Sequence, residues 1–194
     1  MKKKIWVIIL IITALFITGC GNKQETPEQV VANAFQALKE RDLVQIQHYF
    51  PDEEGILDLR SDVPQDDEVL DALLKHLECT VISSSVSGNN ATVNAKIKNV
   101  NFGAVFEEWF GIVLTMAFAD AFSEDSSMAE SNTEELFLNM LKRDGNEMHT
   151  SIIDIQLNKL ENVWVMDITD NEKFQDAIFG GMIASLEKMA NSFK

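Results

Sequence analysis

Basic residues are scarce in this chain of 194 residues. It has 16 Lys and Arg against 31 Asp and Glu, which gives a formal net charge of −15. A chain this acidic repels phosphate backbones and anionic lipid headgroups, so nucleic-acid binding and electrostatic adhesion to a membrane are both disfavoured. The remaining composition, 46% hydrophobic and 24% charged, is that of a globular protein and excludes collagen-like, low-complexity and fully disordered chains.

Groupings typical of metal and nucleotide sites are also missing. The three histidines, His48, His76 and His149, are scattered, and no H-E-x-x-H or paired-cysteine motif accompanies them. No zinc or iron site is therefore expected. The sequence also has no G-x-S-x-G, P-loop or dinucleotide fingerprint, which disfavours serine hydrolases and nucleotide-dependent enzymes. We expect neither a metal nor a cofactor.

The longest apolar run lies at the start of the chain. Three lysines, Lys2–Lys4, precede the uncharged run Ile5–Ile17, and the small residues Thr18 and Gly19 follow it. This is the three-part arrangement of a secretory signal. A membrane-spanning helix needs about 20 apolar residues, and this run is too short for one.

The last four residues of that segment, Ile17–Cys20, resemble the lipobox of bacterial lipoproteins. In such proteins cleavage precedes the cysteine, and its sulfur receives a diacylglyceryl group. The resemblance implies a signal peptide over residues 1–19, a lipidated tether over residues 20–26, and a mature protein on the extracytoplasmic side of the cell membrane. Two acyl chains on Cys20 give durable anchoring.

Only one other cysteine, Cys79, is present. With Cys20 lipidated, no intramolecular disulfide can form. The apolar neighbours of Cys79 favour a buried residue over a reactive thiol.

Residues 27–194 are expected to form a single domain. Thr26, Pro27 and Gln29 have the spacing of a capped helix start, and Asp42 is placed to cap a second short helix that ends before Pro51. Further helices are expected over residues 70–77, 103–122 and 133–141, and from 171 onward with a break at Gly180-Gly181.

Two hairpins lie between these helices. The first pairs Cys79–Ser87 with Ala91–Val100 around Gly88-Asn89-Asn90, and the second pairs Met148–Lys159 with Val163–Thr169. Strands in adjacent pairs favour an antiparallel sheet with helices on one face, which is an α+β fold.

Both ends of this region resemble the nuclear-transport-factor-2-like (cystatin-like) domain. Residues Thr26–Phe50, and within them the segments Ala37–Asp42 and His48–Phe50, resemble the opening of that domain. Residues Asn158–Met166, in which Trp164 follows the turn, resemble its closing hairpin. The resemblance implies a curved sheet wrapped around the N-terminal helices like a cone, leaving a conical pocket. The helices between the two hairpins are additions to it. Lipobox and domain together are similar to small lipoproteins of Gram-positive bacteria.

Members of that family include isomerases, dehydratases and pure binding modules, so the fold does not choose a chemistry. We expect a non-enzymatic binding or interaction module, with Tyr49, Trp109 and Phe110 as candidate ligand-binding residues. Its partner would be a protein or a small apolar ligand, and a homodimer is left open. The alternative is a small-molecule isomerase or dehydratase in which a pocket histidine or carboxylate acts as the general base. The candidates for that base are His48 with Tyr49, Asp154 and Asp167.

The helix expected over residues 103–122 is the most apolar segment of the mature chain. Trp109–Ala119 has no charged residue, and its apolar side chains are too many for one stripe. A helix apolar on most of its circumference must be covered on more than one side. One cover is the sheet. The other side would be covered by the helix at 133–141, by a second copy of the protein, by an apolar ligand or by the membrane surface.

Overall fold

The computed structural model describes residues 24–51, 68–122, 133–168 and 171–192. The expected signal peptide and Cys20 lie outside the described residues, and their assignment stays a prediction.

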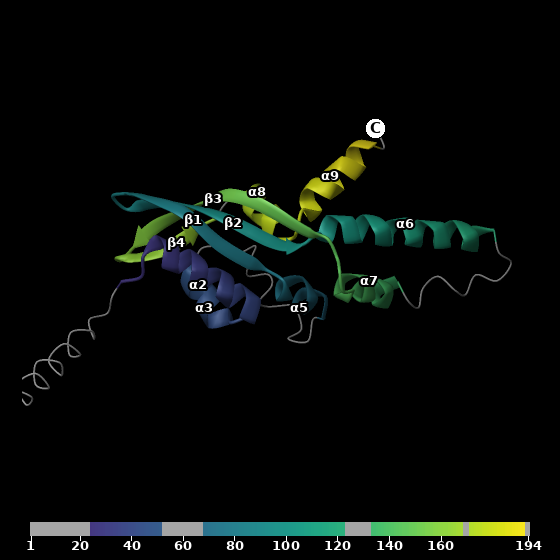
Figure 1. Cartoon of the computed structure of the whole chain (residues 1–194), viewed down its shortest axis with the longest axis horizontal. Coiled ribbons are helices and arrows are strands. Elements are labelled where there is room, and N and C mark those ends of the chain that lie inside the picture. The colour runs from purple at the N-terminus through teal and green to yellow at the C-terminus, as the bar shows by residue number, and fades with distance from the viewer. Residues whose placement is uncertain (1–23, 52–67, 123–132, 169–170, 193–194) are drawn as a thin grey trace, which may run out of the picture.

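The four strands form one antiparallel sheet. They are β1 (Glu78–Ser87), β2 (Asn90–Val100), β3 (Met148–Leu160) and β4 (Val163–Asp167), in the order β1-β2-β3-β4. With helices packed against one face, this confirms the α+β fold expected from the sequence (Figure 1).

Both hairpins close in two-residue turns. Gly88 has φ +62°, and Asn90 already belongs to β2, so the first turn is one residue shorter than expected. In the second turn Glu161 and Asn162 both have positive φ, 48° and 70°. Two consecutive left-handed residues are the requirement of a type I′ turn, whose twist matches that of the strands.

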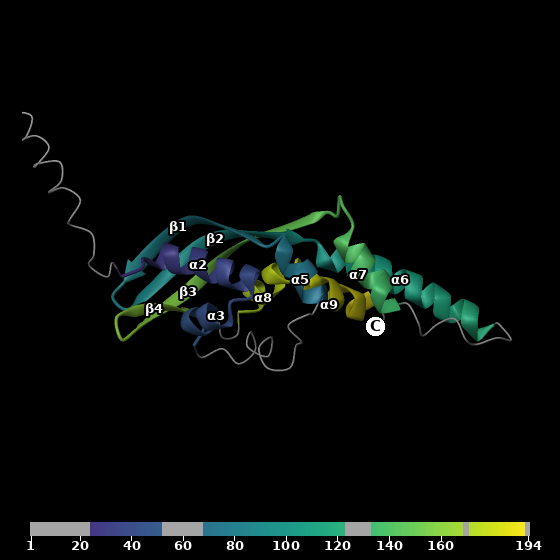
Figure 2. The same ribbon diagram turned by 90° about the horizontal axis from the view of Figure 1, so that it is seen from below.

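One face of the sheet carries the core. Val93 pairs with Ile155 and Ala95 with Ile153, and all four side chains are buried. Helix α2 (Pro27–Glu40) lies across this face, and α3 (Leu43–Tyr49) and α8 (Glu172–Ile178) lie beside it (Figure 2). The apolar face of α2 is buried there, through Val30, Val31, Ala34, Phe35 and Leu38.

Helices α2 and α3 begin where the sequence predicts. Thr26 and Gln29 form a reciprocal capping box at α2, and the Asp42 carboxylate accepts hydrogen bonds from the first amides of α3. These side chains satisfy amides that have no partner within the helix. The caps thereby stabilise the starts of α2 and α3.

Aromatic side chains fill the space enclosed by the sheet and the N-terminal helices. The ring centroid of Phe174, on α8, lies 5.8 Å from that of Phe35 and 6.2 Å from that of Phe50. Trp164 is only 6% exposed and is therefore buried at the closing hairpin. The region where the family resemblance implies a pocket is thus occupied by packed core.

The remaining helices gather at the other end of the sheet. They are α5 (Glu68–Lys75), α6 (Phe102–Ala121), α7 (Thr133–Lys142) and α9 (Met182–Ser192). The expected break between the last two helices is present, because Gly180 and Gly181 both have positive φ. A Cβ atom on Gly180 would lie 1.8 Å from the carbonyl oxygen of Val100, so only glycine permits this approach to the end of β2.

A buried asparagine fixes the same junction. The Asn99 side chain is fully buried, donates from Nδ2 to the carbonyl of Ile178 at 2.7 Å, and accepts from the amide of Val100 at 2.8 Å. Asn101 then caps α6, accepting from the amide of Ala104 at 3.0 Å. The direction in which α6 leaves the sheet is therefore set by a hydrogen-bonded core junction.

Candidate interaction surface

Helix α6 is divided into a packed half and a projecting half. Phe102, Gly103 and Val105 are buried between α7 and α9. The Phe102 ring lies 5.3 Å from that of Phe137 on α7, and the Trp109 ring lies 5.4 Å from it, both edge to face. Trp109 also donates from Nε1 to the carbonyl of Thr133 at 2.8 Å, and this bond marks the end of the packed half.

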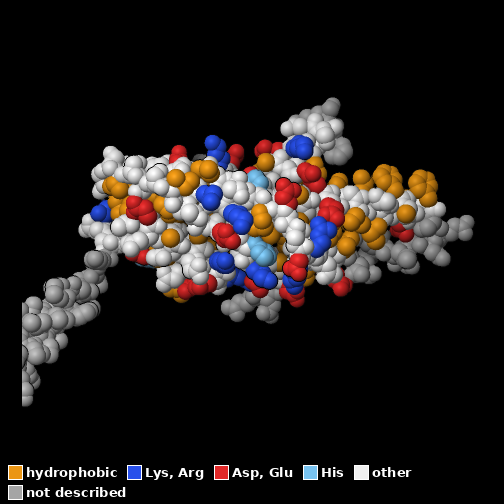
Figure 3. All heavy atoms as spheres, viewed as in Figure 1, with side chains coloured by type: hydrophobic (Ala, Val, Ile, Leu, Met, Phe, Trp, Pro, Cys, Tyr) orange, Lys and Arg blue, Asp and Glu red, His pale blue; other side chains and the backbone are white. Residues whose placement is uncertain are grey.

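Beyond Trp109 the helix extends past the sheet and past α7 and α9 (Figures 1 and 2). We call Phe110–Phe122, which includes the C-cap residue Phe122, the projecting half of α6. The exposed fraction is 37% for Phe110, 61% for Phe118 and 88% for Phe122. Further large apolar side chains are exposed between them: Ile112, Leu114 and Met116. Figure 3 shows this concentration of apolar side chains along α6.

The exposed apolar side chains point in several directions around the helix axis. At 100° per residue, Ile112, Leu114 and Phe118 do not share one narrow stripe. A helix apolar all round is ordinarily buried in a core or embedded in a membrane. In α6 only 17% of the most apolar 18-residue window is buried. This half of α6 is therefore an apolar surface that the described part of the chain leaves largely uncovered.

By length and composition alone, α6 could cross a membrane, and it is the one helix in the described ranges that meets those criteria. Its uncharged stretch is Trp109–Ala119, bounded by Glu108 and Asp120. At about 1.5 Å per residue this stretch covers about 16 Å, roughly half of the hydrocarbon thickness of about 30 Å. The chain also returns to Trp109 through α7, so α6 and α7 form one hairpin on the domain.

The surroundings of the projecting half are acidic. Helix α6 contains Glu107, Glu108 and Asp120 and no basic residue, and the first turn of α7 adds Glu134 and Glu135. Arg143 binds Glu108 with two hydrogen bonds, at 3.2 and 3.0 Å, and these bonds lower the pKa of the Glu108 carboxyl. Among the ion pairs between described residues, none involves Glu134 or Glu135.

The three predicted ligand-binding residues do not form one site. Tyr49 is buried in α3, at the opposite end of the molecule from α6, and its hydroxyl donates to the Glu25 carboxylate at 3.2 Å. Burial and the nearby Glu25 charge raise the pKa of Tyr49. Trp109 and Phe110 are neighbours on α6, where Trp109 packs inward and Phe110 is exposed. Ligand binding by these residues stays a prediction.

The residues considered for the enzymatic alternative lie on three different elements, α3, β3 and β4. His48 is exposed and lies edge to face on the Tyr49 ring. Asp154 accepts from Asn94 at 2.7 Å and Asp167 accepts from Asn158 at 2.8 Å, both on the sheet face opposite the core. In the described ranges, no three His, Cys, Asp or Glu side chains are grouped so that they could hold a metal ion.

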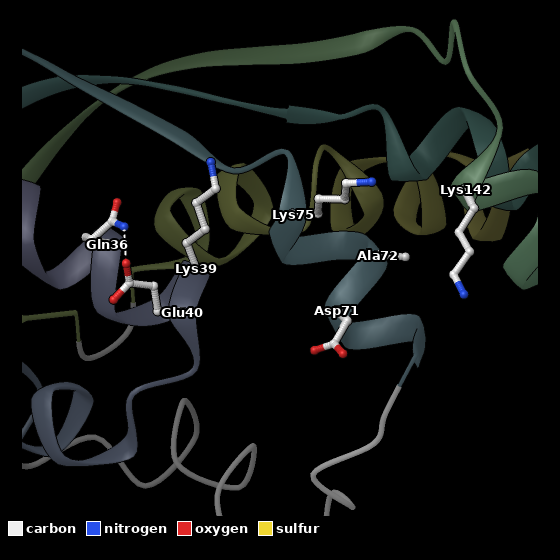
Figure 4. Close-up of a pocket in the computed structure, with 7 residues that line it drawn as sticks. All are labelled: Gln36, Lys39, Glu40, Asp71, Ala72, Lys75 and Lys142. Carbon is white, nitrogen blue, oxygen red and sulfur yellow. Dashed lines mark hydrogen bonds between the residues drawn. The ribbon is translucent and has the colours of Figure 1, made fainter.

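A pocket of about 630 Å³ lies between α2, α5 and α7 (Figure 4). Its cationic side chains are Lys39, Lys75 and Lys142, whose amines point in different directions, and Lys142 is bound to Glu68 at 2.5 Å. Asp71 at the rim is bound to Arg41 at 2.7 Å. The amines do not converge on a point where an anion could sit, so this pocket does not form an anion site.

Cys79 is a structural residue. It is half-buried against the core, and burial raises the pKa of its thiol to about 12. A raised pKa lowers the fraction of thiolate at neutral pH, which favours a structural role over a reactive one. This agrees with the expectation of burial.

Apart from Phe110, the individual residues of the projecting half were not selected from the sequence, which indicates only that the whole segment is apolar. Leu114, Phe118 and Phe122 belong to that segment, but their exposure depends on where α7 and α9 end. The available indication of exposure is that the apolar residues of this segment do not form a single stripe, whereas a helix packed on one side shows an amphipathic pattern.

Comparison with models of protein families and with curated proteins gave no match. Two solved structures are similar in part. One is RPA3114, a SEC-C motif protein of Rhodopseudomonas palustris, with 15% identity over 73% of this chain and 75% of that one and a TM-score of 0.38. The other is the candidate lipoprotein ycdA of Bacillus subtilis, with 15% identity over 78% of this chain and 46% of that one and a TM-score of 0.41. Likenesses this low carry no functional conclusion, and less than half of ycdA is spanned.

Proposed function

We propose that this protein is a lipid-anchored, extracytoplasmic interaction module that binds a partner protein or peptide through the projecting half of α6. The observation that carries the proposal is the exposure of Phe110, Leu114 and Phe118 on a helix held rigidly at its base. Contiguous apolar patches of this kind on soluble proteins mark interaction sites. No catalytic step is proposed.

The position of the tether supports a partner other than the anchoring membrane. Thr26 caps α2 at the hairpin-turn end of the sheet, where Glu28 on α2 accepts a hydrogen bond from Ser84 on β1. The projecting half begins beyond Val100, at the opposite end of β2. The eleven residues of β2 span about 36 Å at about 3.3 Å per residue.

The tether is short by comparison. Residues 20–26 reach at most about 25 Å when extended. A molecule standing on this tether presents α6 away from the lipid, where a partner in the extracytoplasmic space can reach it. The sheet thus acts as a spacer between the anchor and the interaction surface.

Native mass spectrometry tests this function. The full-length protein is purified from the cells it comes from, alongside two double variants. Leu114→Gln/Phe118→Gln changes the projecting half, and Ile82→Gln/Ile152→Gln changes two exposed isoleucines on the sheet as a matched control. We expect a bound protein or peptide with the parent and the control, and its loss from the α6 variant. Equal occupancy in all three, or no bound species in any, would contradict the proposed function.

A further inference from the structure

We infer that the partner is a cationic amphipathic helix, whose apolar face packs on the projecting half of α6 and whose Lys or Arg residues face the surrounding carboxylates. This inference rests on the proposed function and names the chemistry of the partner. Two independent features support it: the shape of the apolar surface and the sign of the charge around it.

The apolar surface has the dimensions of a helix contact. The thirteen residues of the projecting half form about 20 Å of helix, which matches the apolar face of a partner helix of similar length. Helix-in-groove recognition uses large apolar anchors one turn apart, and Phe110, Leu114 and Phe118 follow one another at steps of four residues. Gly111 lies beside them, and a Cβ atom there would meet no other atom within 4 Å. A partner helix can therefore approach α6 closely at Gly111.

The charge around this surface is predominantly negative. Glu107 lies at the base of the projecting half and Asp120 near its tip, and Glu134 and Glu135 lie on the first turn of α7 beside Trp109. Arg143, the nearby cation, is already bound to Glu108. Complementary charge at the rim of an apolar contact accelerates association and excludes partners of the wrong sign. A partner helix with basic residues on both sides of its apolar face complements both the apolar surface and the acidic residues around it.

The same charges disfavour the other occupants. A second copy would bring the same acidic rim against itself, and each chain already carries a net charge of −15. An anionic membrane surface is disfavoured because interfacial helices usually carry Lys and Arg, and α6 has neither.

The test uses two synthetic helices of identical apolar pattern. Leu occupies positions i, i+3, i+4 and i+7 of both peptides, and the remaining positions are Lys in one and Glu in the other. The full-length lipidated protein is held in phosphatidylcholine nanodiscs, and binding is measured by fluorescence anisotropy against empty discs. Four chains are compared: the parent, Leu114→Gln/Phe118→Gln, Glu134→Lys/Glu135→Lys, and the sheet control Asp154→Lys/Glu161→Lys, which makes the same change of charge on β3 and in the β3–β4 turn.

The parent should bind the Lys peptide at least about tenfold more tightly than the Glu peptide, a difference of about 1.4 kcal/mol. The apolar variant should lose about tenfold or more. The Glu134→Lys/Glu135→Lys variant should lose several-fold and show a weaker dependence on salt, because it removes screened charge interactions. The sheet control should bind as the parent does.

Three results would overturn the inference. Equal binding of the Lys and Glu peptides would show that apolar contact alone determines the affinity. The inference would then be wrong, and the proposed function would stand without a charge preference. Binding unaffected by the α6 substitutions would place the peptide elsewhere on the protein. Concentration-dependent dimers of the parent in analytical ultracentrifugation, lost in the α6 variant, would show that a second copy is the occupant.

Discussion

The indole Nε1 of Trp109 donates a hydrogen bond to the carbonyl oxygen of Thr133, 2.8 Å away. Thr133 is the first residue of α7, so this bond joins the middle of α6 to the start of the next helix. Up to Trp109, α6 packs against α7 and α9; beyond it, most of the helix's side chains are exposed in the described part of the chain. The rigid base and exposed end of α6 meet at this residue.

Trp109→Phe should loosen α7 without unfolding the sheet. The substitution keeps an aromatic ring near Phe106 and Phe137 but removes the hydrogen bond, which typically contributes about 1 kcal/mol. Amides of α7 should exchange with deuterium faster, while those of β2 and β3 should be unchanged. Equal acceleration throughout the domain would show that Trp109 belongs to the global core instead.

Trp164→Ala should destabilise the whole domain. The Trp164 side chain is almost completely buried, and truncating a buried tryptophan to alanine costs about 3–5 kcal/mol. Chemical denaturation of the variant should show a lower midpoint with a similar slope. The substitution Lys159→Ala is a useful comparison, since the Lys159 amine lies 5.2 Å from the Trp164 ring centroid but contributes only a surface contact. A small effect of Trp164→Ala would contradict the burial.

The stability of the α2–β1 contact should fall in acid. The Ser84 hydroxyl donates to the Glu28 carboxylate, and this bond, followed by that from Thr26, lowers the pKa of Glu28 below its ordinary 4.5. Because the folded pKa is depressed, the stabilisation is present above pH 4.5 and is lost as the pH falls through the folded value.

Ser84→Ala should therefore lower the free energy of unfolding at neutral pH. That free energy should also decline less steeply below pH 4.5 in the variant than in the parent. Thermal unfolding at a series of pH values measures this. A decline in the variant as steep as in the parent would show that the Glu28–Ser84 bond does not contribute to it.

Cys20→Ser should change where the protein is found. Without the sulfur no diacylglyceryl group can be attached, and the chain should be unprocessed or released instead of being anchored. Membrane fractionation and intact mass measurement of parent and variant decide this. Normal processing and membrane retention of Cys20→Ser would refute the lipoprotein assignment.

Local signals in the sequence predicted most of the fold. The capping residues Thr26 and Asp42 placed the first helices, and in β2 the buried residues Val93, Ala95 and Ile97 alternate with polar ones. These signals are local, because caps and strand alternation depend on residues close together in the chain. The first turn was predicted one residue too long, since Gly88 alone supplies the positive φ that it needs.

The functional surface was only partly predictable. Sequence indicates that the segment from Trp109 to Ala119 needs cover on several sides, but it does not show how far the neighbouring helices reach. That depends on long-range packing: α7 covers α6 only to Trp109, and the close approach of Gly180 to Val100 sets the point from which α9 diverges. For the same reason Tyr49 and Trp109, both aromatic residues on helices, could not be assigned to opposite ends of the molecule.

The most direct test of the account is photocrosslinking in intact cells. Benzoylphenylalanine replaces Phe118 in one version of the full-length protein and Ile152 in another, two sites whose natural side chains are 61% and 63% exposed. The account predicts a light-dependent adduct with another protein from position 118 and none from position 152. Equal adducts from both positions, or an adduct from position 118 with lipid alone, would contradict it.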